Sequence, residues 1–190
     1  MKAYNFNIDN ELNFLEKAEV NMAGKGMDYW ISHLNLKPHP EGGYYTESFR
    51  SKDFIPSKCT EGKFDGKRSY LTSIYFLLSD GNFSAFHRLK QDEIWSYHTG
   101  STIFVHIIND DGSYEKHKVG LNIEDGETPQ FVIKAGQWFS YHVEEENGFT
   151  LVGCVVVPGF EFADFELGKR QDLIAKYPQH KDIITKYTRN

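Results

Sequence analysis

The residues best suited to chemistry lie between positions 80 and 100, in the stretch DGNFSAFHRLKQDEIWSYHTG. His87 is followed six residues later by Glu93, and Gly100 follows seven residues after that. An imidazole and a carboxylate at this spacing are half of a metal site, since such a site usually needs roughly three or four protein ligands. The same pair can also serve as general base and acid without any metal.

These residues fall within a segment that is predicted to be all strand. From Tyr44 to Val157, short runs rich in Val, Ile, Thr, Phe and Tyr alternate with turn signals such as SDGN, HTGS and NDDGS. This pattern predicts an antiparallel sandwich or barrel. The expected strands cover roughly 44–50, 69–78, 84–89, 93–98, 101–108, 114–121, 130–133, 138–143 and 150–157.

Helices are expected only near the ends of the chain. Apolar residues at helical spacing predict short helices over roughly 9–20 and 27–36, and two more in the tail, separated by Pro178. We therefore predict an all-β fold with short helices at both termini. We divide the chain into an N-terminal helical extension (1–36), a β domain (37–167) and C-terminal helices packed on that domain (168–190).

Strand alternation predicts which side chains point into the barrel. If Glu93 points inward, Trp95 and Tyr97 do so as well, and inward Phe139 implies inward Tyr141.

By the same rule Glu47 shares a face with Tyr45 and Phe49, opposite to Arg50, and an ordinary surface carboxylate is an equally good interpretation of Glu47. His39 is expected at the surface.

The stretch with His87 resembles the first cupin motif, G-x5-H-x-H-x(3,4)-E-x6-G. Gly81, His87, Glu93 and Gly100 match it, and Leu89 replaces the second histidine. The second cupin motif, G-x5-P-x-G-x2-H, resembles TPQFVIKAGQWF, in which Gly136 matches, Lys134 stands at the proline and Phe139 at the histidine. Two of the four usual ligand positions therefore remain.

Four separate stretches resemble the type-five cupins, a cupin-like family of unknown function. They are HPEGGYYTESFRS, TSIYFLLSDGNFSAFHRLKQDEIW, GETPQFVIKAGQW and LVGCVVVPGFEFADFEL. The resemblance spans roughly residues 38 to 167. It implies a small cupin (RmlC-like) jelly-roll barrel, usually dimeric, with no established activity.

A more distant resemblance suggests a chemistry. Residues 43–47, GYYTE, are similar to the G-x-F-x-E strand of the dTDP-sugar 3,5-epimerases, a metal-free branch of the cupins. Those enzymes place a histidine base near the position of His87. They also have two arginines where this chain has Gly42 and Ser84. Both differences weaken the case for a nucleotide-diphosphate substrate.

The predicted site is centred on His87 and Glu93 as catalytic residues. We expect Glu93 to orient His87 or share a proton with it, and the expected substrate-binding residues are Tyr45, Glu47, Phe76, Trp95, Tyr97 and Phe139. A bound metal at His87 and Glu93 is disfavoured, because apolar Leu89 and Phe139 delete two ligands, and no other cofactor is expected. The competing interpretation of His87 is a structural, hydrogen-bonded core histidine.

The predicted function is binding, and as a further hypothesis isomerising, a small polar molecule such as a sugar derivative. One alternative is a cupin that binds or senses a small molecule without turnover. A second is a metal-dependent cupin enzyme. On the metal-free hypothesis, changing His87 to Asn should abolish ligand binding or turnover at little cost in stability.

Charge and composition narrow the list of partners. A net charge of −6 without an evident basic face argues against nucleic acid. No apolar run reaches the length of a membrane span. Cys59 and Cys154 are far apart and form no CxxC motif, which suggests reduced thiols and a cytoplasmic location. A homodimer is expected, because edge strands need cover and two-fold dimers are the commonest soluble assembly.

Overall fold

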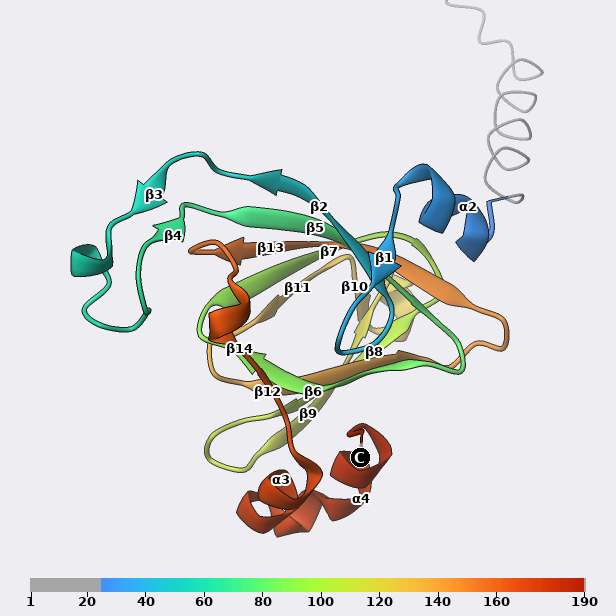
Figure 1. The fold of residues 1–190 in the computed structure, drawn as a ribbon. Helices are drawn as coiled ribbons and strands as arrows, with labels where there is room; N and C mark the ends of the chain where they lie inside the picture. The colour runs from blue at the N-terminus through green and yellow to red at the C-terminus, as the bar shows by residue number, and fades with distance from the viewer. Residues whose placement is uncertain (1–24, 190) are drawn as a thin grey trace, which may run out of the picture.

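Two six-stranded sheets packed face to face form a jelly roll, as the computed structural model of residues 25–189 shows (Figure 1). The first sheet has the order β1-β2-β5-β13-β7-β11 and the second the order β10-β9-β8-β12-β6-β14. Nearly all neighbouring strands are antiparallel, and the β9–β10 pair is parallel. The predicted all-β jelly roll with terminal helices is confirmed.

The strands of the first sheet are β1 (Lys37–Pro38), β2 (Tyr44–Arg50), β5 (Thr72–Ser79), β7 (Asp92–Gly100), β11 (Gln130–Ile133) and β13 (Phe149–Val157). Those of the second are β6 (Phe83–Leu89), β8 (Ile103–Ile108), β9 (Tyr114–Val119), β10 (Glu127–Thr128), β12 (Trp138–Val143) and β14 (Phe165–Leu167). The bounds of β2, β11 and β12 are those that the alternation predicted.

One predicted strand, 69–78, is divided in two. Residues Arg68–Ser69 form β4, which pairs with β3 (Phe54–Ile55) in an arm that extends away from the sheets (Figure 1). The 3-10 turn η1 (Ser57–Cys59) lies in this arm. The ladder of the first sheet starts only at Thr72, because residues 51–71 turn outward before they return. Residues 69–78 read as one continuous run of strand-forming residues, so the sequence did not show that β4 pairs with β3 whereas β5 pairs with β2.

The core between the sheets is largely aromatic. Trp95, Phe139 and Tyr141 are all buried in one cluster with Phe76 and Val152. The inward positions that alternation predicted for Trp95, Phe139 and Tyr141 are therefore confirmed. Tyr97, at the edge of this cluster, is only partly buried.

Helices cover the outer faces of the sandwich. The C-terminal helices α3 (Arg170–Lys176) and α4 (Lys181–Lys186) flank the 3-10 turn η4 (Pro178–His180). They bury Leu173, Ile184 and Tyr187 against the outer side of the second sheet. Other 3-10 turns are η2 (Ile123–Asp125) and η3 (Phe162–Asp164).

The N-terminal helix α2 (Met27–His33) packs against the first sheet and is shorter than the predicted 27–36. The expected helix 9–20 lies outside the described residues. None of the helices within residues 25–189 has the length and apolar character needed to cross a bilayer.

Candidate functional site

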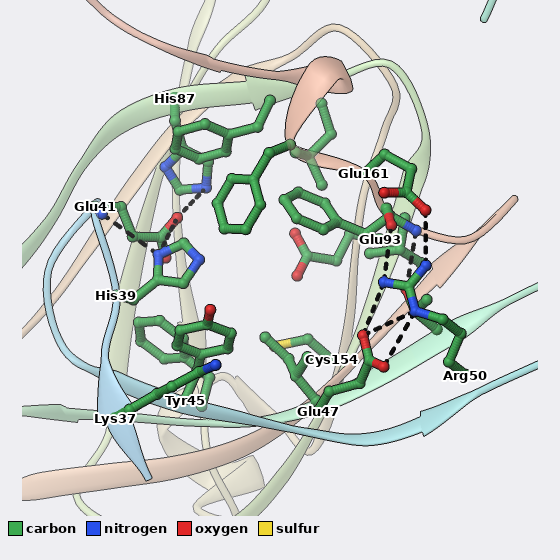
Figure 2. A pocket seen from close by; sticks show the side chains of 18 of the residues that line it. Lys37, His39, Glu41, Tyr45, Glu47, Arg50, His87, Glu93, Cys154 and Glu161 are labelled. Atoms are coloured by element: carbon green, nitrogen blue, oxygen red, sulfur yellow. Dashed lines mark hydrogen bonds and ion pairs between the residues drawn. The ribbon is translucent and has the colours of Figure 1, made fainter. Parts of the chain in front are cut away.

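A cavity of about 270 Å³ opens at one end of the sandwich, between the two sheets (Figure 2). Its lining comes from β1 and the β1–β2 connection, from strands β2, β5, β6, β7, β12 and β13, and from the segment after β13. The lining residues are Lys37, His39, Glu41, Tyr45, Glu47, Arg50, Thr72, Ile74, Phe76, His87, Leu89, Glu93, Tyr141, Cys154, Val156, Phe160, Glu161, Phe162 and Phe165. Titratable side chains thus meet an apolar, largely aromatic wall.

His87 lies on β6, is only 3% exposed, and has both ring nitrogens engaged. Nδ1 is 2.7 Å from the carbonyl oxygen of Ala85, and Nε2 is 3.0 Å from Oε2 of Glu41. A carbonyl can only accept, so Nδ1 carries the proton and Nε2 of the neutral ring accepts one. Burial lowers the pKa of His87 to about 4, so the ring is neutral at pH 7.

Glu41 lies in the turn between β1 and β2 and is only 4% exposed. The hydroxyl of Tyr141 donates to its Oε1, and burial raises the pKa of the carboxyl group. A protonated Glu41 can donate through Oε2 to the free lone pair of His87 Nε2. One hydrogen-bond chain therefore runs from Tyr141 through Glu41 and His87 to the carbonyl of Ala85, and burial favours the neutral form of each titratable member.

Two glycines hold the turn that carries Glu41 against the second sheet. Gly42 and Gly43 have φ angles of 116° and 74°, which side-chain-bearing residues rarely adopt. A Cβ at Gly42 would collide with the carbonyl oxygen of Phe83. The backbone N–H of Ala85 donates to the carbonyl of Glu41 at 2.9 Å and fixes the turn next to His87.

His39 was expected at the surface, and that prediction is wrong. Its side chain is 7% exposed and lines the cavity beside Glu41. The short connection between β1 and β2 folds over the open end of the sandwich, so residues that look like loop residues in the sequence become part of the site. Burial is the main cause that lowers the pKa of His39. His39 and Glu41 both belong to the stretch HPEGG, one of the stretches that resemble the type-five cupins, and that resemblance was the available sequence signal for their role in the site.

Glu93 lines the same cavity, but the carboxyl group that contacts His87 belongs to Glu41 and not to Glu93 as expected. β6 and β7 are consecutive in the chain but belong to opposite sheets, which separates the two side chains. In Figure 2, Glu41 lies directly against His87 and Glu93 lies farther across the cavity. Burial, followed by the nearby Glu41, raises the pKa of Glu93 to about 8. Glu93 is therefore mostly protonated at neutral pH.

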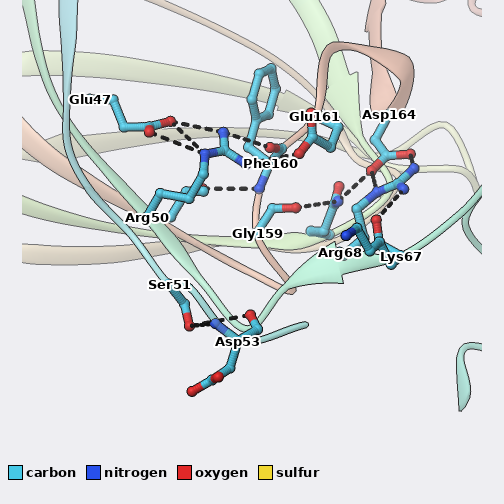
Figure 3. Close-up of polar contacts among 12 residues, drawn as sticks. Glu47, Arg50, Ser51, Asp53, Lys67, Arg68, Gly159, Phe160, Glu161 and Asp164 are labelled. Atoms are coloured by element: carbon cyan, nitrogen blue, oxygen red, sulfur yellow. Dashed lines mark hydrogen bonds and ion pairs between the residues drawn. The ribbon is translucent and has the colours of Figure 1, made fainter. Parts of the chain in front are cut away.

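The rim of the cavity carries a charged cluster (Figures 2 and 3). The Arg50 guanidinium binds both oxygens of Glu47 at 2.8–3.1 Å, and also Glu161 at 2.8 Å. Glu47 and Arg50 were expected on opposite faces of β2. That expectation is wrong, because a register shift between Glu47 and Phe49 reverses the alternation.

The remaining predicted binding residues are placed at different depths. Tyr45 and Phe76 line the cavity, as Glu47 does. Trp95 and Phe139 are buried in the core beneath it and do not line it. The hydroxyl of Tyr97 donates to the carbonyl of Gly100, the last residue of its own strand.

The donors around His87 do not fit a cupin metal. Within residues 25–189 no group of three or more His, Cys, Asp or Glu side chains is placed to hold an ion. The Phe139 ring, at one of the two substituted ligand positions, packs 4.0 Å from the imidazole of His87. Both nitrogens of His87 are hydrogen-bonded within the protein.

Comparison with known proteins identifies the relatives of this fold and site. A family model described as "Cupin superfamily (DUF985)" matches residues 28–168. An uncharacterized protein of Saccharomyces cerevisiae is 32% identical over 152 residues, which are 75% of this chain and 75% of the yeast protein.

Two solved structures are similar over most of the chain. A protein from Shewanella oneidensis has a TM-score of 0.77 and 41% identity, covering 86% of this chain and 98% of that one. A hypothetical protein from Leishmania major has a TM-score of 0.80 and 35% identity, covering 87% and 99%.

Proposed function

Since this chain belongs to the cupin superfamily, in the family described as DUF985, we propose that it binds a small polar molecule, such as a sugar derivative, in its cavity and moves protons on it. A polar floor under an apolar, aromatic wall is the usual composition of a small-molecule site. The floor consists of His87, Glu41 and Glu93, and the wall includes Tyr45 and Phe76.

The observation that carries this proposal is the pair of oppositely shifted groups at the floor. The pKa of His87 is lowered to about 4 and that of Glu93 is raised to about 8. At pH 7 the cavity therefore offers a neutral imidazole and a neutral carboxylic acid. Titratable groups pushed apart in this way commonly supply the base and the acid of one reaction.

An isomerisation requires both roles, because one group removes a proton from the substrate and another returns a proton to it. His87 is the proposed acceptor once its Nε2 is released from the hydrogen bond to Glu41, and Glu93 is the proposed donor. No net proton is consumed in such a reaction. The ion pairs among Arg50, Glu47 and Glu161 lie at the rim of this cavity.

Binding without turnover is the second candidate, and one observation favours it. Both nitrogens of His87 are engaged by Ala85 and Glu41, so the ring can serve mainly to shape the floor. In that case the cavity holds a ligand and no proton leaves it.

Proton exchange in deuterated water separates the two candidates. The protein is incubated with aldoses, ketoses and sugar lactones, binding is followed by thermal shift, and proton NMR detects deuterium at the sugar carbons. Binding with exchange that is lost in Glu93→Gln supports the catalytic proposal, with Glu115→Gln as an exposed control. Binding without exchange supports the second candidate. A panel in which no compound binds contradicts both.

A further inference from the structure

The cavity contains a second imidazole whose outer nitrogen is free. His39 Nδ1 accepts a hydrogen bond from the backbone N–H of Glu41 at 3.4 Å and lies 3.5 Å from Oε2 of that carboxyl group. Among residues 25–189, Nε2 of His39 has no hydrogen-bond partner, and Figure 2 shows it directed into the cavity. His87, in contrast, has both nitrogens occupied.

The contact with the Glu41 backbone bears on which nitrogen of His39 carries the proton. A backbone N–H only donates, so this contact favours the tautomer in which Nδ1 accepts and the proton of the neutral ring lies on Nε2, whereas the Glu41 carboxyl oxygen at 3.5 Å could instead accept from Nδ1. In the favoured tautomer, His39 presents an N–H donor to the cavity.

Aromatic rings on several sides hold the His39 imidazole in this orientation. The ring of Tyr45 meets it edge-on with centroids 4.6 Å apart, Phe76 lies at 5.9 Å, and Phe162 is stacked with it at 6.2 Å.

Burial favours the neutral forms of His39 and of the three groups at the floor of the cavity. It lowers the pKa of His39 and His87 and raises that of Glu41 and Glu93. These four groups offer a charged ligand no counter-charge for the hydration that it would lose, and the cations of the lining are Arg50, which is paired with carboxylates, and Lys37, which lies over the Tyr45 ring. The protonated Glu93 and the His39 N–H are both donors, and they would pair with acceptor oxygens.

We infer that His39 contacts the ligand through Nε2–H, and that the part of the ligand which reaches the floor is an uncharged group with acceptor oxygens, such as the carbonyl of a sugar or sugar lactone. This inference rests on the proposed function and adds the contacting residue and the ligand class. Glu41 is a positioning residue in this arrangement, because its backbone N–H favours this tautomer of His39.

The first test needs no ligand. Ring-nitrogen NMR of 15N-histidine-labelled protein at pH 7, assigned with His39→Gln and His87→Asn, reports the tautomer of each ring. We expect Nε2–H for His39 and Nδ1–H for His87. A His39 ring that is protonated on Nδ1, or on both nitrogens, overturns the inference.

The second test uses matched probes. D-Glucose and D-glucono-1,5-lactone are compared with D-gluconate and D-glucose 6-phosphate by NMR titration. The uncharged probes should bind more tightly than the charged ones. His39→Leu should weaken their binding about tenfold, whereas His39→Gln, which keeps a donor, should retain most of it and the exposed control His33→Leu all of it.

The outcomes separate this inference from the proposed function. Tighter binding of the charged probes, or binding unchanged in His39→Leu, overturns the inference while the proposed function stands. Failure of all four probes to bind, with His39 protonated on Nε2, contradicts the proposed function and supports the assignment of His39 as the free donor.

Discussion

At the scale of single residues, the site depends on buried titratable groups whose neutral forms are favoured. His87, Glu41 and Tyr141 satisfy one another by hydrogen bonds, and burial removes the solvation that their charged forms would need. A buried polar group that loses its hydrogen-bond partner is costly, so removing any one of these three side chains is expected to lower the stability of the protein.

Replacing Glu93 by Gln should change how stability depends on pH. The raised pKa of about 8 means that the native state keeps a proton which the unfolded chain releases near pH 4.5. The contribution of Glu93 to the free energy of unfolding therefore falls as pH rises from 4.5 towards 8. His87 acts in the opposite direction, because its lowered pKa costs stability as pH falls from 6.5 towards 4.

Between pH 6.5 and 8 only the Glu93 contribution changes among these two groups. Wild type should lose about 1–2 kcal/mol of unfolding free energy across that range, and Glu93→Gln should lose much less. Urea denaturation at a series of pH values measures both proteins. Parallel pH profiles would show that Glu93 is already ionised in the native state.

His87→Asn should cost more stability than the sequence suggested. An asparagine side chain can replace the Nδ1 contact to Ala85, but it leaves Glu41 without its partner at Nε2. An unsatisfied buried group costs about 1–3 kcal/mol. Urea unfolding of His87→Asn, beside the exposed control His98→Asn, measures the difference, and equal stabilities for the two variants would contradict the hydrogen-bond chain.

At the scale of elements, the sequence predicted strands better than it predicted contacts between them. β11 and β12 appear at their expected bounds, because alternation and turn residues are local signals. Which side chains contact one another depends on the sheet to which each strand belongs, and that is not set by the local sequence. Glu93 was paired with His87 on motif spacing, yet β6 and β7 lie in different sheets.

The missed site residues follow from the same limit. His39 and Glu41 lie in a connection without periodicity, and their role depends on how that connection docks on the second sheet. The register shift in β2 likewise moved Arg50 to the side of Glu47. Neither feature leaves a repeat in the sequence, although the two glycines after Glu41 mark an unusual backbone.

A buried ion pair joins the base of the arm to the wall of the cavity (Figure 3). Arg68 in β4 binds both oxygens of Asp164 at 2.6 and 2.8 Å, and Gln91 donates to the same carboxylate at 2.7 Å. The side chains of Arg68 and Asp164 are 3% and 0% exposed. Asp164 belongs to η3, the turn that also carries Phe162 of the cavity wall.

Asp164→Ala should therefore be strongly destabilising. It leaves the Arg68 guanidinium without its counter-charge, for which the typical loss is about 3–5 kcal/mol. Glu161→Ala, which removes an exposed partner of Arg50 only a few residues away, should cost less than about 1 kcal/mol. Thermal and urea unfolding compare the two variants. Similar losses for both would mean that burial of the Arg68–Asp164 pair is unimportant.

At the scale of the whole molecule, a homodimer remains the prediction. β11 is an edge strand of the first sheet, and Val132 on it is an exposed apolar residue. An open edge of this kind favours pairing with another copy. Multi-angle light scattering at micromolar concentration should give twice the mass of one chain, and a monomer mass would contradict the prediction.

The protein is also expected to hold no stoichiometric transition metal after purification without added metal. Leu89 and Phe139 stand at two of the ligand positions of the cupin motifs, and His87 is already hydrogen-bonded through both nitrogens. Elemental analysis is the measurement. One metal ion per chain that disappears in His87→Ala would overturn the metal-free interpretation.

Arg189 connects the C-terminal helices to the turn of the site. Its guanidinium donates to the carbonyl oxygens of Phe83 at 2.9 Å and Glu41 at 3.3 Å, and Arg189 lies three residues after the end of α4 and two after the buried Tyr187. A molecule that orders the Glu41 turn should therefore also slow protease cleavage within residues 170–189, because such coupling is reciprocal. The tail can then act as a built-in reporter of occupancy, and it allows compounds to be screened by digestion alone.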